Sequence, residues 1–258
     1  MRRKYILCFS GTGRSIKYTI DNLEKNLVND VSPKHIFLVT ENQKYLDELR
    51  GHFKKHKNVS IKIVENVVSV GRDLTFTDTG LWPEQQTQLN YLNFLYKRYS
   101  LSKMIQEYNK VENIEDCHFI YSRLDVTYKY PISSMVKKVK VNKKVYLPNF
   151  HHWLRGYNDR FALANYKNFI KYLEIYPNLR DYNNDIPIHS ESITRLHFVK
   201  NNLKLGIIRL PFSRVRENGV VFDDVEQFDQ RFIFPLKANK HIYRESTLDS
   251  LRLIFNKK

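Results

Sequence analysis

The sequence predicts an α/β protein in which a mostly parallel central sheet is flanked by helices. Three apolar runs of strand type, at 5–10, 35–40 and 59–66, alternate with two segments of helical period, an order typical of parallel sheets. The chain has 258 residues, enough for one large domain or two small ones. Because its 8 glycines and 8 prolines form no linker that divides the chain, we expect a single domain over 1–258.

The elements expected in the first half follow from short apolar runs and helical periods. After the first strand, Ile16, Ile20 and Leu23 recur with the spacing of a helix, and Pro83 suits the first turn of a later, long helix. In order, the predicted elements are a strand (5–10), a glycine turn (10–15), a helix (15–29), a strand (35–40), a helix (42–56), a strand (59–66), a helical region (79–111) and a strand (117–125).

The second half is predicted to add two strands and two helices. The elements are a short strand (145–148), a helix (160–176), a helix (188–202) and a strand (204–211). From Ser213 onward the chain is expected to be irregular and charged.

Charge and cysteine usage indicate the partners and the compartment. The formal charge of +16 attracts polyanions such as nucleic acid, anionic lipid surfaces or phosphorylated ligands, although a chain that simply favours lysine on its surface has the same charge. Cys8 and Cys117 lie in apolar runs without a CxxC pattern, which predicts buried free thiols and a reducing compartment. The basic start lacks the long apolar run of a signal peptide, and no stretch approaches the about 20 apolar residues of a membrane helix, so we expect a cytoplasmic protein.

A glycine turn, FSGTGRS, joins the first predicted strand to the first helix. Such a turn lets backbone N–H groups approach a phosphate or a base, but it has neither the GK[ST] of a P-loop nor a third glycine. A tight connection is the plain alternative. Arg14 favours a ligand site, because an arginine at a helix start can bind a phosphate through two parallel hydrogen bonds.

A second candidate is Arg123 with Asp125, at the end of the predicted strand 117–125. Side chains two residues apart on a strand point to the same face, and ligands of parallel sheets sit beyond the carboxyl ends of the strands. The pair is expected to share one cleft with the glycine turn. The alternatives are a ligand site, in which a carboxylate holds a metal that carries a diphosphate, and a mutual surface ion pair.

Two later segments are rich in polar side chains. In the loop NFHHWLRGYNDRFALA, Asp159 is a candidate both for a helix N-cap and for a ligand contact. The adjacent His151 and His152 do not have the spacing of a metal pair. Glu191 stands in the first turn of a predicted helix, where the helix dipole favours it; if it faces the cleft, it is a candidate general base.

Taken in order, these motifs resemble those of glycosyltransferases of the GT-A type, and among them small, divergent bacterial and viral proteins. The matching segments are SGTGR (10–14), RLDVTY (123–128), NDRFALA (158–164) and SE (190–191). The resemblance spans roughly residues 4–215. It implies one GT-A (Rossmann-like) domain with a nucleotide-binding part (about 1–130), an acceptor-side part (about 131–215) and a C-terminal extension (about 216–258).

The resemblance also implies the substrates. The donor would be a nucleotide-diphosphate sugar, with UDP or GDP as carrier, and the acceptor a hydroxyl group of a glycan or protein. The residues that would bind the donor are Ser10, Gly11, Gly13, Arg14, Arg72, Arg123 and Asp125.

The resemblance assigns a metal and two carboxylates to the reaction. Asp125 stands where a DxD motif has its last aspartate and would hold Mn²⁺ or Mg²⁺; Arg123 replaces the first aspartate and offers a second way to neutralise the diphosphate. Asp159 and Glu191 would lie near the transferred sugar or the acceptor as catalytic residues. Whether the transfer inverts or retains the configuration is left open.

Two other classes of function fit parts of the sequence. A basic nucleic-acid-binding protein is suggested by the charge and the 17 tyrosines, although most aromatic residues fall at core-periodic positions. A Rossmann-type methyltransferase is suggested by the glycine turn together with Glu41, an acidic residue after the second strand that is suited to bind a ribose.

Overall fold

A seven-stranded sheet forms the centre of the fold. The structure, a computed structural model, describes residues 3–41, 43–66, 74–76, 85–150, 152 and 156–222. In spatial order the strands of this sheet are β3 (Val59–Ile63), β2 (His35–Thr40), β1 (Tyr5–Ser10), β4 (His118–Arg123), β7 (Phe161–Asn165), β6 (Lys144–Pro148) and β8 (Lys204–Ile208). Every neighbouring pair is parallel except the two that involve β7. The predicted α/β class with a mostly parallel sheet is confirmed.

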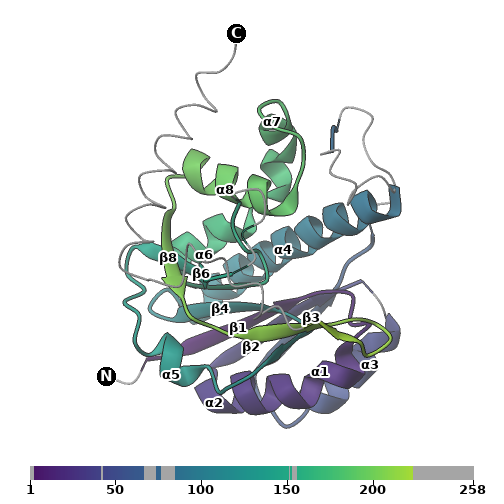
Figure 1. Cartoon of the computed structure of the whole chain (residues 1–258). Coiled ribbons are helices and arrows are strands. Elements are labelled where there is room, and N and C mark those ends of the chain that lie inside the picture. Colours follow the sequence, from purple (N-terminus) through teal and green to yellow (C-terminus); the bar gives the residue numbers. More distant parts are fainter. Residues whose placement is uncertain are drawn as a thin grey trace.

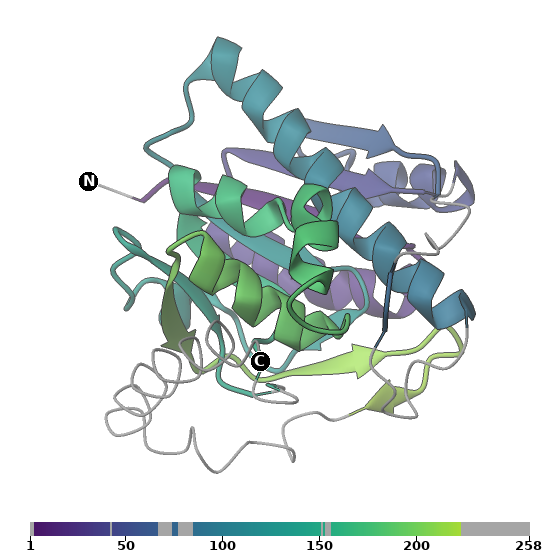
Figure 2. The same ribbon diagram turned by 90° about the horizontal axis from the view of Figure 1, so that it is seen from above.

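Helices cover both faces of the sheet (Figure 1). The α1, α2 and α3 helices lie on one face, and α4, α6 and α8 lie on the other. The helical elements are α1 (Ile16–Leu23), a π-helical turn (Glu24–Val28), α2 (Asn29–Val31), α3 (Gln43–Phe53), α4 (Gln85–Glu112), α5 (Ser133–Val136), α6 (Tyr166–Leu173), a 3₁₀ turn (Tyr176–Asn178), α7 (Leu179–Asn183) and α8 (Ser190–Lys200). The long α4 helix crosses the sheet beside α6, as the view from above shows (Figure 2).

Alternation along the strands divides the core into two layers. On β1, Leu7 and Phe9 pack with the α1 side of the sheet, whereas Ile6 and Cys8 pack with the α4 side. All four side chains are fully buried, as expected for a central strand that is covered on both faces. Burial also raises the pKa of the Cys8 thiol, and the prediction of two buried free cysteines is confirmed.

The helix predicted over 160–176 is wrong in its first part. Residues Phe161–Asn165 form β7, which pairs antiparallel with β4, and the helix α6 begins only at Tyr166. Asn165 is the N-cap residue of α6: its side chain accepts a hydrogen bond from the Asn168 N–H at 3.0 Å. The predicted role of Asp159 as a helix cap is therefore also wrong, because Asp159 precedes a strand.

A second, three-stranded sheet replaces the irregular stretch expected after residue 213. Its order is β10 (Val221–Phe222), β9 (Phe212–Val215) and β5 (Val126–Tyr128), all antiparallel. Because β5 follows β4 after only two residues, this small sheet lies beside the carboxyl end of β4. No helix among the described residues has both the length and the apolar character that crossing a membrane requires.

Candidate functional site

A pocket of about 910 Å³ opens at the carboxyl ends of β1 and β4. These two strands are neighbours, yet the chain leaves β1 towards β2 on the opposite side, so the strand order reverses between them. In open α/β sheets, such a reversal leaves a crevice that is the usual place for a ligand. The described residues that line the pocket are Ser10, Gly11, Thr12, Gly13, Arg14, Ser15, Thr87, Asn90, Tyr91, Phe94, Lys97, Arg123, Leu124, Asp125, Asp159, Arg160, Ser190, Arg214, Val215, Arg216, Glu217 and Asn218.

The glycine turn after β1 forms one wall of the pocket. Ser10 is buried at the end of β1, where its hydroxyl lies 2.9 Å from the Tyr121 hydroxyl. Gly13 has a φ of +75°, and a Cβ at this position would lie 2.8 Å from the Cβ of Tyr45. Both the backbone conformation and the space therefore require glycine. The turn ends at Arg14, whose Nε donates to the Thr12 hydroxyl at 3.2 Å and whose Nη1 lies 3.4 Å from Glu217 Oε2.

Arg123 and Asp125 form the ion pair that their spacing predicted. Arg123 donates from Nε and Nη2 to the two oxygens of Asp125, at 2.8 and 2.5 Å. Burial alone would raise the pKa of Asp125, but the Arg123 charge and these hydrogen bonds, with Arg160 nearby, lower it. Phe94 of α4 covers the guanidinium of Arg123, whose Cζ lies 5.5 Å from the ring centroid.

Asp159 reaches the same pocket from the start of β7. Because β7 runs antiparallel to β4, its first residues lie at the edge where β4 ends. Asp159 is 3% exposed; its Oδ1 accepts no hydrogen bond from the described residues and lies 3.7 Å from Arg160 Nη1. Asn158 holds the backbone in place, because its side chain accepts from the Arg160 N–H at 2.8 Å and donates to the Phe150 carbonyl at 2.8 Å.

Glu191 lies behind Arg160 at the start of α8. Its Oε1 is 3.4 Å from Arg160 Nη1, its Oε2 is 3.5 Å from His189 Nε2, and the Ser190 hydroxyl donates to it. Burial lowers the pKa of His189, and the negative charge of Glu191 opposes that shift. Among the described residues, Ser190 lines the pocket and Glu191 does not. Glu191 is therefore placed to orient Arg160 and Ser190.

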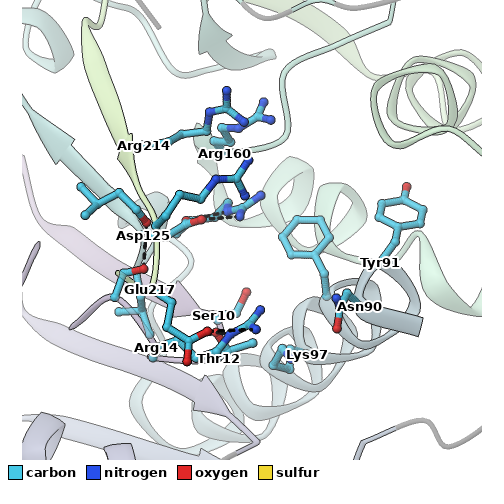
Figure 3. Close-up of a pocket in the computed structure, with 18 of the residues that line it drawn as sticks. Ser10, Thr12, Arg14, Asn90, Tyr91, Lys97, Asp125, Arg160, Arg214 and Glu217 are labelled. Atoms are coloured by element: carbon cyan, nitrogen blue, oxygen red, sulfur yellow. Dashed lines mark hydrogen bonds and ion pairs between the residues drawn. The ribbon is translucent and has the colours of Figure 1, made fainter. Parts of the chain in front are cut away.

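Two walls of the pocket were absent from the sequence-based set. The first is the face of α4 that carries Asn90, Tyr91 and Lys97, across the pocket from Asp125 (Figure 3). The sequence indicated only an apolar core stripe here; the signal that was missed is the polar residues at helical spacing beside that stripe. Lys97 is buried and pairs with Glu41, and burial lowers its pKa more than this partner raises it.

The second missed wall is formed by Arg214 of β9 and by Arg216 and Glu217 of the turn that follows it. Figure 3 shows Arg214 beside Arg160 and Glu217 beside Arg14. Phe212 and Val215 are residues that favour strands, a signal that the high charge of the segment obscured. Arg72, predicted to contact the donor, and His151 lie outside the described residues.

The described side chains of this pocket do not provide the oxygen ligands that a divalent cation needs. Mg²⁺ and Mn²⁺ need several oxygen ligands arranged around one point. Both oxygens of Asp125 already accept hydrogen bonds from Arg123, which takes the place of a second carboxylate. Within the described ranges, no three His, Cys, Asp or Glu side chains are grouped so that they hold a metal ion.

Comparisons with known proteins give similarities of fold. No family model matches the sequence, and no curated protein matches it. Among solved structures, the apo glycosyltransferase GlyE of Streptococcus pneumoniae has 14% identity and a TM-score of 0.46, over 79% of this chain and 45% of GlyE. This chain thus spans about half the length of GlyE.

Two further similar structures are those of a galactosyltransferase and of a synthase. The galactosyltransferase LgtC, solved with donor and acceptor sugar analogues, has 10% identity and a TM-score of 0.49, over 78% of this chain and 73% of LgtC. The 4-diphosphocytidyl-2C-methyl-D-erythritol synthase of Anaerococcus prevotii has 10% identity and a TM-score of 0.42, over 95% of this chain and all of that one. At these identities the similarity concerns the fold alone, and one fold supports several reactions.

Proposed function

We propose that this chain transfers a sugar from a nucleotide-diphosphate sugar to a hydroxyl group of a glycan or protein. The observation that carries the proposal is that the glycine turn, the Arg123–Asp125 pair and Asp159 line one pocket at the reversal of strand order. Six basic side chains and three acidic ones are among the described residues of its lining, which suits an anionic ligand.

The arrangement of the pocket suggests how such a donor lies. The glycine turn with Arg14 would face the nucleotide, since backbone N–H groups and an arginine are suited to phosphate and base contacts. Arg123 would face the diphosphate. Asp159 precedes β7, on the side of β4 that faces away from β1 and its turn, and would then lie at the sugar and the acceptor.

In the proposed reaction, the bond between the anomeric carbon and the diphosphate breaks, and the diphosphate leaves with the electron pair. The sugar passes through an oxocarbenium-like transition state, and the acceptor oxygen bonds to the anomeric carbon. In the inverting course the acceptor hydroxyl gives its proton to a carboxylate. Asp159 suits this role better than Glu191, because its Oδ1 accepts no hydrogen bond from the described residues, whereas Glu191 is engaged by Arg160, His189 and Ser190.

The methyltransferase alternative is disfavoured by Glu41. That function needs the carboxylate after β2 to receive a ribose. Glu41 instead forms an ion pair with buried Lys97, and only Lys97 of the two lines the pocket within the described part of the chain.

The test measures binding and turnover separately. A panel of nucleotide sugars and S-adenosylmethionine is screened for a rise in melting temperature, and release of the nucleoside diphosphate is then followed with the ligands that bind. We expect Asp159→Asn to reduce release by about 100-fold or more, because a positioned base contributes about 10²–10⁴ in rate, and to keep donor binding within about threefold.

The matched control is Asp116→Asn, which removes the same charge at an exposed position outside the pocket. It should release nucleoside diphosphate at the wild-type rate. If S-adenosylmethionine stabilises the protein and no nucleotide sugar does, the proposed function is wrong.

A further inference from the structure

We infer that arginine side chains, and not a divalent cation, hold the donor's diphosphate, with Arg123 and Arg216 as its principal contacts. This inference rests on the proposed function and adds to it the chemistry of the diphosphate subsite. Four features of the described residues support it. Both oxygens of Asp125 accept hydrogen bonds from Arg123, and the side chain of Arg123 is held in place. Arg216 lines the same pocket, and positive charge exceeds negative charge around both arginines.

Asp125 holds the guanidinium of Arg123 through two hydrogen bonds. A guanidinium has five N–H donors, and the two that bind Asp125 leave three for a ligand. The ion pair and the covering ring of Phe94 fix the plane of the guanidinium at the end of β4. Asp125 is thus a positioning residue that directs Arg123 into the pocket, and its oxygens are not available to a metal.

Arg216 directly follows β9 and lines the same pocket as Arg123. The Val215 N–H donates to the Asp125 carbonyl at 2.9 Å, and the Val215 carbonyl accepts from the Ser15 hydroxyl at 2.8 Å. Val215 is buried, and it lines the pocket together with Arg214 and Arg216 on either side of it. The Arg216 backbone is closed by a hydrogen bond from its N–H to the Val220 carbonyl at 2.9 Å, and its Cζ lies 5.2 Å from the Phe222 ring centroid.

The charges around Arg216 are incompletely balanced. Arg216 is exposed overall, and the partial burial of its side chain together with the positive charges of Arg214 and Arg123 lowers its pKa, against the opposite effect of Asp125. Asp125 already pairs with Arg123, and no carboxylate among the described residues lies within ion-pair distance of Arg216. A diphosphate placed between Arg123 and Arg216 would relieve this repulsion.

The same side chains suit the departure of the leaving group. As the bond to the anomeric carbon lengthens, negative charge grows on the diphosphate oxygens. Guanidinium groups that are already fixed beside them stabilise that charge without reorganisation, and the planar fork of N–H groups matches two phosphate oxygens.

Inorganic pyrophosphate is the binding probe, because it carries the diphosphate without a nucleotide base. Binding is measured by calorimetry with EDTA present, for wild type, Arg216→Ala and Arg216→Lys. We expect wild type to bind in EDTA and Arg216→Ala to bind about 10- to 100-fold more weakly, the usual effect of removing a hydrogen bond to a charged group. Arg216→Lys should recover part of the loss, since it keeps the charge and loses the fork.

Arg50→Ala is the matched control, because Arg50 is exposed on α3 and lies outside the pocket lining. It should change pyrophosphate binding by less than about twofold, as expected for a screened surface charge. Equal weakening in Arg50→Ala and Arg216→Ala would overturn the inference, and so would wild-type binding that appears only after Mn²⁺ or Mg²⁺ is added.

Turnover separates the inference from the proposed function. Release of nucleoside diphosphate that proceeds in EDTA supports both. Release that EDTA abolishes and Mn²⁺ restores would overturn the arginine subsite and leave the glycosyl transfer intact. If no nucleotide sugar binds or turns over under either condition, the proposed function fails and the inference fails with it.

Discussion

His197 is a buried, neutral side chain on α8, the helix whose first turn borders the pocket. Its Nε2 lies 2.6 Å from the Lys171 carbonyl, and its Nδ1 lies 2.8 Å from the Tyr182 hydroxyl. A carbonyl oxygen only accepts, so Nε2 carries the proton and Nδ1 accepts from Tyr182. Protonation of Nδ1 would break this arrangement, and burial lowers the pKa of His197 to about 4.

This pKa predicts a loss of stability in mild acid. Because the folded pKa lies below the usual 6.5, the unfolded chain binds a proton first as the pH falls. The stabilisation by neutral His197 is complete above about pH 6.5 and decreases towards pH 4, by about 3 kcal/mol in total. Burial likewise lowers the pKa of His35 to about 4. Urea unfolding between pH 7 and 4.5 should therefore show a fall in stability whose slope His197→Gln reduces; an unchanged slope would contradict the assignment.

The residues of the site were predictable where the rule involved is local. Arg123 and Asp125 share a face because they are two positions apart on extended chain, and Gly13 is required by the turn. Local rules could not predict which residue from a distant part of the chain each of these side chains contacts. Glu191 faces Arg160 across 31 positions of sequence, and Arg14 meets Glu217 across 203. Such contacts depend on the packing of whole elements.

At the scale of elements, the turn between β1 and α1 is the most constrained piece of the pocket. Gly13 combines a positive φ with a close approach to Tyr45, whereas Gly51 on α3 has no atom within 4 Å of an added Cβ. The two glycines therefore provide a matched pair. Gly13 is required by its backbone conformation and its neighbours, whereas Gly51 only lowers the stability of the α3 helix.

We expect opposite effects from alanine at these two positions. Gly13→Ala should lower the free energy of unfolding by about 2 kcal/mol, from an unfavourable φ and the contact with Tyr45, and should weaken pyrophosphate binding by displacing the turn. Gly51→Ala should raise that free energy by about 0.5–1 kcal/mol, because alanine is favoured in a helix. Chemical denaturation and calorimetry measure both effects. A neutral Gly13→Ala would show that the turn tolerates a side chain.

The segment FALAN (161–165), which was predicted as helix and forms β7, shows why some strands are not predicted from the sequence. Phe161, Ala162, Leu163 and Ala164 are all fully buried, because β7 lies in the interior of the sheet with both faces covered. Such a strand has no polar alternation, and its alanines favour a helix. The true helix begins directly after it, so one apolar run contained both elements. The boundary was marked only by Asn165, the residue that caps α6.

At the scale of the whole molecule, the charge of +16 leaves the nucleic-acid alternative to be tested. Binding of single strands usually combines a basic groove with aromatic rings on which bases stack. Among the described residues, the exposed large aromatic side chains are Tyr18 on α1, Tyr130 after β5 and Phe222 on β10. They lie on separate elements, and Phe222 already stacks with arginine side chains.

We therefore expect only weak, salt-sensitive binding of nucleic acid. A labelled single-stranded DNA or RNA should bind with a Kd of about 10⁻⁵ M or weaker at physiological salt, and the affinity should fall steeply as salt is raised. Fluorescence anisotropy over a salt series measures this. A complex about 100-fold tighter at physiological salt would favour the nucleic-acid alternative over an enzyme whose charge serves a small anionic substrate.

The Ser15–Val215 hydrogen bond closes the pocket with residues from distant parts of the chain. As the protein is synthesised, β1, β2, β3 and β4 can pair long before residue 215 leaves the ribosome, yet the wall that carries Arg214 and Arg216 is still missing. A nascent chain would then contain the glycine turn, Arg14 and Arg123 but lack Arg214 and Arg216. An anion that needs both groups of arginines would therefore stabilise the native state late in folding and would not direct its early steps.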